Sequence, residues 1–218
     1  MTQRKRIAII GGGIVGATAA FYLSQKNYEV TLYDDGVGQA TSAAAGIICP
    51  WLSQRRNKEW YQLASKGAAF YPQLMDDLGE SLTHSDIYQQ VGALVFKKNL
   101  GLLKKLEKTA LKRLETASEI GELALLSPKE IKVKFPLYDS EESALFASGG
   151  ARVDGSLLTE KLITQAQSNG LGYYSEKVTL SSTNSSEYVI HTKTHAKTYD
   201  TVVLAVGAWL PELLAPLG

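Results

Sequence analysis

The sequence has little cysteine and no excess of charge. Cys49 is its single cysteine in 218 residues, so the chain cannot form an internal disulfide or a cysteine-rich zinc module. A lone thiol suits a reducing compartment, and we therefore expect a cytoplasmic protein. The 23 lysines and arginines nearly balance 22 aspartates and glutamates, for a formal net charge of +1. Such a balance creates no general field for nucleic acid or anionic lipid, and we expect neither as a partner.

Long apolar runs and metal-ligand patterns are also missing. The uncharged run from Ile7 to Leu23 follows three basic residues, which is the outline of a secretory signal peptide, but several glycines interrupt it. A transmembrane helix needs about 20 strongly apolar residues, so we expect no integral membrane segment. The 3 histidines show no metal-ligand spacing, and we expect no metal site.

The N-terminal segment predicts a parallel βαβ unit. Lys5–Ile10 is short, β-branched and followed by glycine, which is typical of a buried strand. The segment from Gly13 to about Ser24 predicts a helix, and Tyr28–Tyr33 predicts a second strand. Parallel strands need a right-handed crossover, so we expect an α/β, Rossmann-like fold with helices on a parallel sheet.

The middle of the chain has a different character. Apolar residues recur at a spacing of three to four along Trp60–Leu78 and along Leu103–Ala117, which predicts two amphipathic helices. Ile87–Phe96 predicts extended structure with Gly92 as a bulge, and Ala144–Ala147 predicts a short strand. Because nucleotide-fold segments at both ends enclose this segment, we expect a discontinuous architecture.

Helix and strand signals continue toward the C-terminus. Ser127, followed by proline, and Asp154 are typical N-caps, and the second helix is expected to run to about Ser168. The expected strands are Tyr173–Leu180, Glu187–His191 after the polar turn Ser181–Ser186, and the strongly buried Thr201–Val206.

The strongest motif is a G-x-G-x-x-G between the first strand and the helix. Gly11 permits a tight turn, Gly13 lets the backbone approach a pyrophosphate, and Gly16 allows the helix to pack on the strand. The free amides and positive end of the helix would then hold the phosphates. A glycine-rich turn without a ligand is the alternative, and the strand–turn–helix context favours the dinucleotide site.

Asp34 stands at the end of the second strand, 18 residues beyond Gly16. A carboxylate there can accept both ribose hydroxyls and would repel a 2′-phosphate, which favours FAD or NAD over NADP. The alternative is a turn-forming aspartate before Asp35 and Gly36.

Three later segments favour FAD over NAD as the cofactor, because they resemble segments of a known family. Residues 40–48 resemble a loop that lies along the flavin, residues 149–158 resemble a G-G-x-R-V-D-P-x-x-L segment with Gly155 in place of proline, and residues 201–209 resemble the strand that returns to the FAD site. With the glycine motif, these segments resemble the D-amino-acid oxidase family of FAD-dependent oxidoreductases, which includes glycine oxidase, sarcosine oxidase and D-amino-acid dehydrogenases. The resemblance spans Ile7 to Leu217 and is weakest from Leu52 to Ser143.

The resemblance implies the cofactor FAD and a set of contacts to it. It also implies a discontinuous FAD-binding domain, residues 1–50 and 145–218, and part of a mixed α+β substrate domain, residues 51–144. No catalytic residue is assigned. The expected cofactor-binding residues are Gly11, Gly13, Ile14, Val15, Gly16, Asp34, Asp35, Ala40, Thr41, Ser42, Ala45, Gly46, Ile47, Val178, Ala205 and Gly207.

The function implied is oxidation of the C–N bond of a small amino acid or secondary amine, by hydride transfer to flavin N5. The alternatives are a non-catalytic FAD-binding fragment that lacks the substrate clamp and, on the glycine motif and Asp34 alone, an NAD-dependent dehydrogenase.

Family members continue well beyond residue 218, where they carry the arginine that grips the substrate carboxylate. We therefore expect a truncated or excised portion of an enzyme, with little activity alone and a tendency to self-associate. Cys49 lies just past the flavin loop, and we expect an ordinary buried thiol and no covalent flavin.

Overall fold

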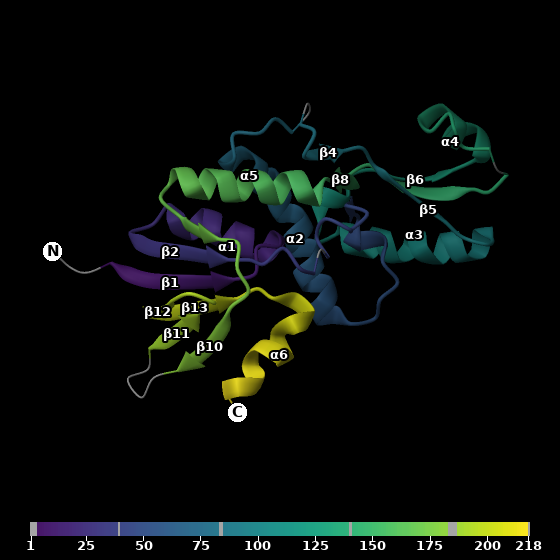
Figure 1. Cartoon of the computed structure of the whole chain (residues 1–218). Coiled ribbons are helices and arrows are strands. Elements are labelled where there is room, and N and C mark those ends of the chain that lie inside the picture. Colours follow the sequence, from purple (N-terminus) through teal and green to yellow (C-terminus); the bar gives the residue numbers. More distant parts are fainter. Residues whose placement is uncertain (1–3, 39, 83–84, 140, 183–186, 218) are drawn as a thin grey trace. The chain divides into compact units, whose positions relative to one another are not determined.

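The computed structural model describes residues 4–38, 40–82, 85–139, 141–182 and 187–217. The chain divides into two compact units, which are described separately (Figure 1). The first unit contains residues 1–44 and 154–218, and the second contains residues 45–153. The functional assignment of residues 1–50, 145–218 and 51–144 remains a prediction.

A four-stranded parallel sheet forms the centre of the first unit. Its order is β13-β1-β2-β9, and Ile7 lies opposite Val30 on one side and Thr201 on the other. Ala8 and Ile9 in the middle of β1 are fully buried on opposite faces, which explains the continuous apolar run. The four strands are β1 (Lys5–Ile10), β2 (Tyr28–Tyr33), β9 (Gly172–Tyr174) and β13 (Thr201–Leu204).

Two layers cover this sheet. On one face, α1 (Ile14–Ser24) and α5 (Gly155–Ser168) pack together, and Ala20 and Ala166 join Ile9 in one apolar cluster. The other face carries the antiparallel sheet β10-β11-β12 (Figure 1). That sheet consists of β10 (Thr179–Ser182), β11 (Tyr188–His191) and β12 (Ala196–Tyr199). The α/β class with a parallel sheet and helices is therefore confirmed.

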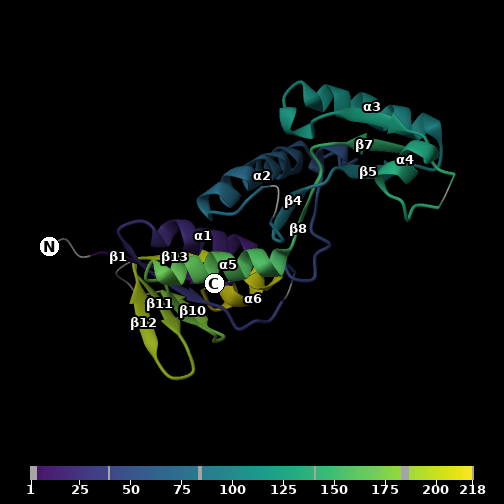
Figure 2. The same cartoon turned by 90° about the horizontal axis from the view of Figure 1, so that it is seen from above.

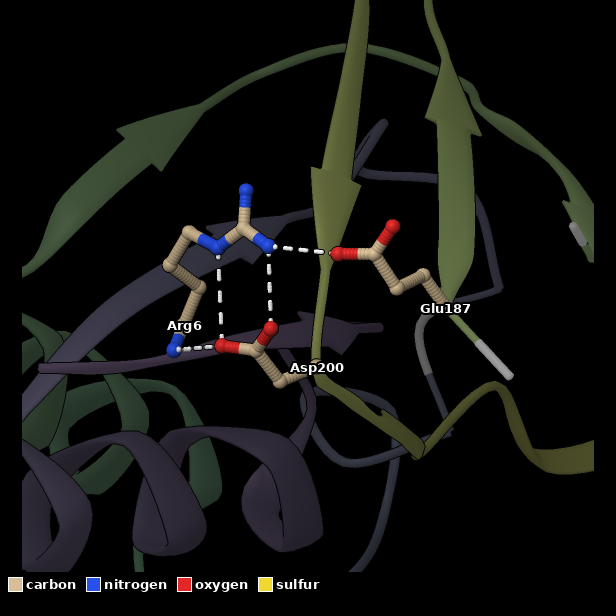
Figure 3. Close-up of polar contacts among 3 residues, drawn as sticks. All are labelled: Arg6, Glu187 and Asp200. Atoms are coloured by element: carbon tan, nitrogen blue, oxygen red, sulfur yellow. Dashed lines mark hydrogen bonds and ion pairs between the residues drawn. The ribbon is translucent and has the colours of Figure 1, made fainter. Parts of the chain in front are cut away.

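Arg6 and Asp200 join the two ends of the first unit (Figure 3). The Arg6 guanidinium contacts both Asp200 oxygens, with Nη2 2.9 Å from Oδ1 and Nε 3.4 Å from Oδ2. Nη2 also lies 3.0 Å from Glu187 Oε1 at the start of the hairpin. In addition, the Arg6 amide donates to Asp200 Oδ2, and the Asp200 amide donates to the Arg6 carbonyl. These contacts hold the corner between β12 and β13 against the start of β1.

Two strand predictions near the C-terminus are wrong in part. Tyr173–Leu180 is divided between β9 in the parallel sheet and β10 in the antiparallel sheet, because the chain leaves β2 after Tyr174. The last strand ends at Leu204, and its residues are half-buried because β13 is an edge strand among the described residues. Ser181 and Ser182 belong to β10, and the rest of the expected polar turn, residues 183–186, lies outside the described residues.

The second unit combines two small sheets with helices (Figure 2). One sheet has the order β3-β8-β4 and the other β5-β7-β6, all antiparallel. The strands are β3 (Ile47–Ile48), β4 (Tyr88–Gln90), β5 (Ala93–Phe96), β6 (Leu123–Leu126), β7 (Ala144–Ala147) and β8 (Ala151–Val153). The helices are η1 (Pro50–Leu52), α2 (Lys58–Asp77), α3 (Leu100–Leu114), η2 (Ser118–Ile120) and α4 (Pro128–Lys134).

Gly92 is a break between two strands, and its assignment as a bulge is wrong. It has φ +79° and donates its amide to the Gly150 carbonyl at 2.7 Å, so β4 and β5 enter different sheets.

The apolar stripe expected on α2 is buried only toward its C-terminal end, where Leu74 is 3% exposed while Leu63 is 75% exposed. The helix starts are confirmed, because Asp154 caps α5 and Ser127 forms a capping box at α4.

Candidate functional site

The turn between β1 and α1 uses glycine at each motif position. Gly11 has φ +100° and donates its amide to the Tyr33 carbonyl at 2.8 Å. A Cβ on Gly11 would lie 2.5 Å from the Ala205 carbonyl oxygen, and a Cβ on Gly16 would overlap the Gly11 carbonyl oxygen. The close packing of turn, helix and β13 therefore excludes larger residues at both positions.

Thr41 closes the first turn of α1. Its Oγ1 accepts the Ile14 amide at 3.1 Å, and a Cβ on the N-cap residue Gly13 would lie 3.2 Å from the same oxygen. Val15, in the first turn, is 66% exposed. The helix thus begins with an exposed turn, the Thr41 hydroxyl and a glycine at Gly13, which are features that suit an anionic ligand.

The Asp34 carboxylate faces this glycine turn. A Cβ on Gly12 would come within 2.6 Å of Asp34 Oδ2, so the missing side chain at Gly12 makes room for the carboxylate. The Asp34 amide donates to the Tyr174 carbonyl at 3.1 Å, which joins the end of β2 to the end of β9. Asp35 occupies the turn instead, because its Oδ1 accepts the Val37 amide at 3.0 Å. The two neighbouring aspartates therefore have different surroundings.

A cleft of about 230 Å³ opens beside Asp34 in the first unit. Ile10, Gly11 and Tyr33 line it at the carboxyl ends of β1 and β2, where open parallel sheets bind ligands. Val178 and Leu213 supply apolar walls. These walls are apolar, and the Asp34 carboxylate lies beside them.

The rim of the cleft is charged. Lys177 Nζ lies 3.1 Å from Glu212 Oε1, and both side chains are mostly exposed. Glu212 belongs to α6 (Leu210–Leu214), which follows η3 (Gly207–Trp209) and precedes η4 (Ala215–Leu217). Asp35 and Glu176 also line the cleft, so acidic groups outnumber the lysine at this opening. An additional anionic group at this opening would meet this negative charge.

The expected cofactor residues fall into three places. Gly11, Asp34, Asp35 and Val178 line the cleft. The remaining residues of the first unit lie at the β1–α1 turn, on the segment after it and at the end of β13: Gly13, Ile14, Val15, Gly16, Ala40, Thr41, Ser42, Ala205 and Gly207. Ala45, Gly46 and Ile47 belong to the second unit. Their roles as cofactor contacts remain predictions.

Gly46 and Ile47 belong to the segment that resembles a flavin loop, and backbone pairing holds them within the second unit. Gly46 has φ +67°, and its carbonyl accepts the Val153 amide at 2.8 Å. A Cβ on Gly46 would overlap the Val153 carbonyl oxygen, so glycine is required there. Ile47 pairs with Arg152 in β3–β8 and is 75% exposed. Cys49 is half-buried, and burial raises the pKa of its thiol.

Several residues of the cleft were not expected from the sequence. Tyr33 lines the cleft and directly precedes Asp34 in the sequence, so its place there could have been predicted from that position. Trp209 lines the cleft, and its ring lies where a side chain on Gly38 would overlap it. Glu212 and Leu213 belong to no sequence motif. They reach the cleft only because α6 runs past it.

Two negative findings concern the described residues. Within the ranges that the structure describes, no helix has both the length and the apolar character needed to cross a membrane. In the same part of the chain, no three His, Cys, Asp or Glu side chains gather where they could share a metal ion.

Comparison with known proteins gives one family and several relatives. Residues 6–218 match the DAO family, described as FAD dependent oxidoreductase. The chain is 40% identical over 215 residues to the uncharacterized oxidoreductase YurR of Bacillus subtilis, covering 98% of this chain and 58% of that protein. A glycine oxidase of Geobacillus kaustophilus is 32% identical over 230 residues, covering 100% of this chain and 58% of that protein.

The fold is shared with solved structures. The crystal structure of iminodiacetate oxidase from Chelativorans sp. BNC1 has a TM-score of 0.91 at 33% identity and covers 98% of this chain and 58% of that chain. Glycine oxidase from Geobacillus kaustophilus has a TM-score of 0.77 at 26% identity. The chain thus spans about 58% of the length of these relatives.

Proposed function

The chain belongs to the DAO family of FAD-dependent oxidoreductases, and on that premise we propose that its cleft binds the adenosine end of FAD. The observation that carries the proposal is the Asp34 carboxylate, which lies against Gly12 beside a cleft at the carboxyl ends of β1 and β2. A carboxylate at this place can accept the two ribose hydroxyls. The apolar wall at Val178 suits the adenine ring.

The pyrophosphate would bind at the start of α1. The helix has 11 residues, and its positive end and first amides attract anionic groups. The bare backbone at Gly13 leaves room for a phosphate oxygen, and the Thr41 hydroxyl can donate to one while its oxygen accepts from Ile14. We carry forward the contacts at Ala40, Ser42, Ala45, Gly46, Ile47, Ala205 and Gly207 as part of this proposal.

We propose that the enzyme oxidises the C–N bond of a small amino acid or secondary amine. Bound FAD would supply a two-electron acceptor for the hydride that leaves the substrate α-carbon. The resulting imine would then be hydrolysed by water. The names of two relatives, glycine oxidase and iminodiacetate oxidase, support a small substrate in which an amine lies next to a carboxylate.

The contribution of this chain to that reaction is binding and orientation. In a cofactor enzyme the protein holds the reactive atoms in place, and orientation alone can supply a large part of the rate enhancement. Gly11, Asp34 and the first turn of α1 would hold the adenosine and pyrophosphate, and this would limit where the flavin ring can lie. We assign no proton-transfer residue to the described part of the chain.

A substrate panel tests the reaction class. The purified chain is loaded with FAD and given glycine, sarcosine, iminodiacetate, D-alanine and D-proline, while peroxide release and reduction of an artificial dye are followed in parallel. Turnover with any of them supports C–N oxidation, and peroxide release separates an oxidase from a dehydrogenase. If flavin binds without turnover on any of the substrates, the chain is an FAD-binding portion and the catalytic proposal for it is wrong.

A further inference from the structure

Two tyrosine hydroxyls meet inside the first unit. The Tyr33 and Tyr199 hydroxyl oxygens lie 2.7 Å apart and share a hydrogen bond, although the residues are separated by 166 positions. Tyr33 is 1% exposed and Tyr199 is 0% exposed. Ala8, Ile10 and Leu180 surround them in the same apolar cluster. Burial and the hydrogen bond to Tyr199 raise the pKa of Tyr33, so the Tyr33 hydroxyl stays neutral.

Tyr33 is connected to both parts of the candidate nucleotide site. Its carbonyl accepts the Gly11 amide at 2.8 Å, which holds the first residue of the glycine turn. The next residue is Asp34, whose amide donates to the Tyr174 carbonyl, and the rings of Tyr33 and Tyr174 stack at 5.3 Å. The Tyr33 backbone thus holds Gly11 directly and is bonded to Asp34, so a displacement of this residue would be passed to both.

Tyr199 is itself held in place from the other side. It is the last residue of β12, and its neighbour Asp200 forms the two-point ion pair with Arg6 shown in Figure 3. The Tyr199 hydroxyl therefore projects next to a corner that the Arg6–Asp200 contacts hold, and it meets the Tyr33 hydroxyl there.

We propose that Tyr199 is a positioning residue which acts through Tyr33 to hold Gly11 and Asp34 in the geometry that accepts a nucleotide. The proposal rests on the proposed function for the identity of the ligand, but the positioning can be measured without it. A buried hydroxyl without a partner is costly, so loss of either hydroxyl favours a rearrangement of the other. In the apolar cluster around Tyr33 and Tyr199 the displaced hydroxyl would have to turn toward the cleft or draw in water.

The test compares Tyr199→Phe, Tyr33→Phe and the double variant with wild type. Tyr188→Phe is the matched control, because Tyr188 lies in the same hairpin but is 37% exposed. NMR measures hydrogen exchange at the Gly11 and Asp34 amides in the chain without FAD. We expect exchange about five- to tenfold faster in both single variants, and no change in the control. The double variant should be no faster than either single one, since the hydroxyls act as a pair.

FAD titration of the same proteins separates the two proposals. Weaker FAD binding by about fivefold in Tyr199→Phe, with faster exchange at Gly11 and Asp34, supports the positioning role and the proposed function together. If the wild-type chain binds no FAD but the variants still show faster exchange at Gly11 and Asp34, the positioning role stands and FAD is rejected as the ligand. A lower melting temperature with unchanged exchange at Gly11 and Asp34 would show a purely structural role for Tyr199 and overturn the inference.

Discussion

Arg6 and Asp200, which are 194 positions apart in the chain, form a two-point ion pair that is reinforced by their own backbone amides (Figure 3). The side-chain hydrogen bond from Arg6 is the main cause that lowers the pKa of Asp200. A carboxyl whose pKa is lower in the folded state stabilises the fold above its unfolded pKa, about 3.9 for aspartate, and loses this contribution as the pH falls through the folded value.

We predict that Asp200→Asn lowers the melting temperature at pH 7 and that the difference from wild type disappears in acid, below the ordinary carboxyl pKa. Thermal melts followed by circular dichroism across this pH range measure it. Asp139→Asn is the control, because Asp139 is 97% exposed and lies 3.7 Å from Lys132. A difference that persists unchanged to the acid end of the range would show that the charge of Asp200 is not what stabilises the corner.

We predict that Gly12→Ala weakens FAD binding while the chain stays folded. The new Cβ would lie 2.6 Å from Asp34 Oδ2, so the carboxylate must move, and Gly12 has no positive φ that would strain the backbone. Fluorescence titration with FAD measures the loss. Gly67→Ala is the control, since among the described residues a Cβ there would meet open space. Wild-type affinity in Gly12→Ala would show that the position of the carboxylate does not matter for the ligand.

Thr41 offers a prediction about the first turn of α1. Thr41→Val removes the oxygen that accepts the Ile14 amide at 3.1 Å, and the loss of one such hydrogen bond costs about 0.5–1.5 kcal/mol. Both unfolding free energy and FAD affinity should fall. Thr41→Ser keeps the hydroxyl and should restore both. Equal behaviour of the serine and valine variants would assign the effect to side-chain packing.

Cys49 is predicted to carry no covalent flavin. Burial raises the pKa of its thiol, which lowers the fraction of nucleophilic thiolate at neutral pH. Acid precipitation of the FAD-loaded protein should leave all yellow colour in the supernatant, and iodoacetamide should react slowly until the chain is unfolded. Colour that stays with the precipitate, and disappears in Cys49→Ser, would establish an attachment at this residue.

The local patterns near the N-terminus were sufficient for the βαβ unit. β1 and β2 begin and end at the residues expected from the sequence, because buried parallel strands are short apolar runs bounded by glycine and polar turns. Asp154 and Ser127 were equally clear, since their caps depend on neighbours two or three residues away. The bounds of these elements depend on residues that are close together in the sequence, so they can be predicted from the sequence alone.

Elements that depend on distant partners were harder to predict. Nothing within Tyr173–Leu180 indicates that β9 pairs with β2 while β10 pairs with β11. At the candidate site, the spacing of Gly11 and Asp34 was readable because it follows from one crossover. The Tyr33–Tyr199 pair was not readable, because its two hydroxyls meet only after the hairpin has packed beneath the parallel sheet.

The most direct measurement of the central claim is an equilibrium titration of the purified chain with FAD, followed by flavin fluorescence and the visible absorption spectrum. We predict saturable binding of FAD, no binding of NADP because Asp34 repels a 2′-phosphate, and a loss of about 1–3 kcal/mol of FAD binding free energy in Asp34→Ala, since the ribose hydroxyls lose their acceptor. A chain that binds no FAD, or that binds it with wild-type affinity after Asp34→Ala, would contradict the assignment of the cleft as the adenosine site.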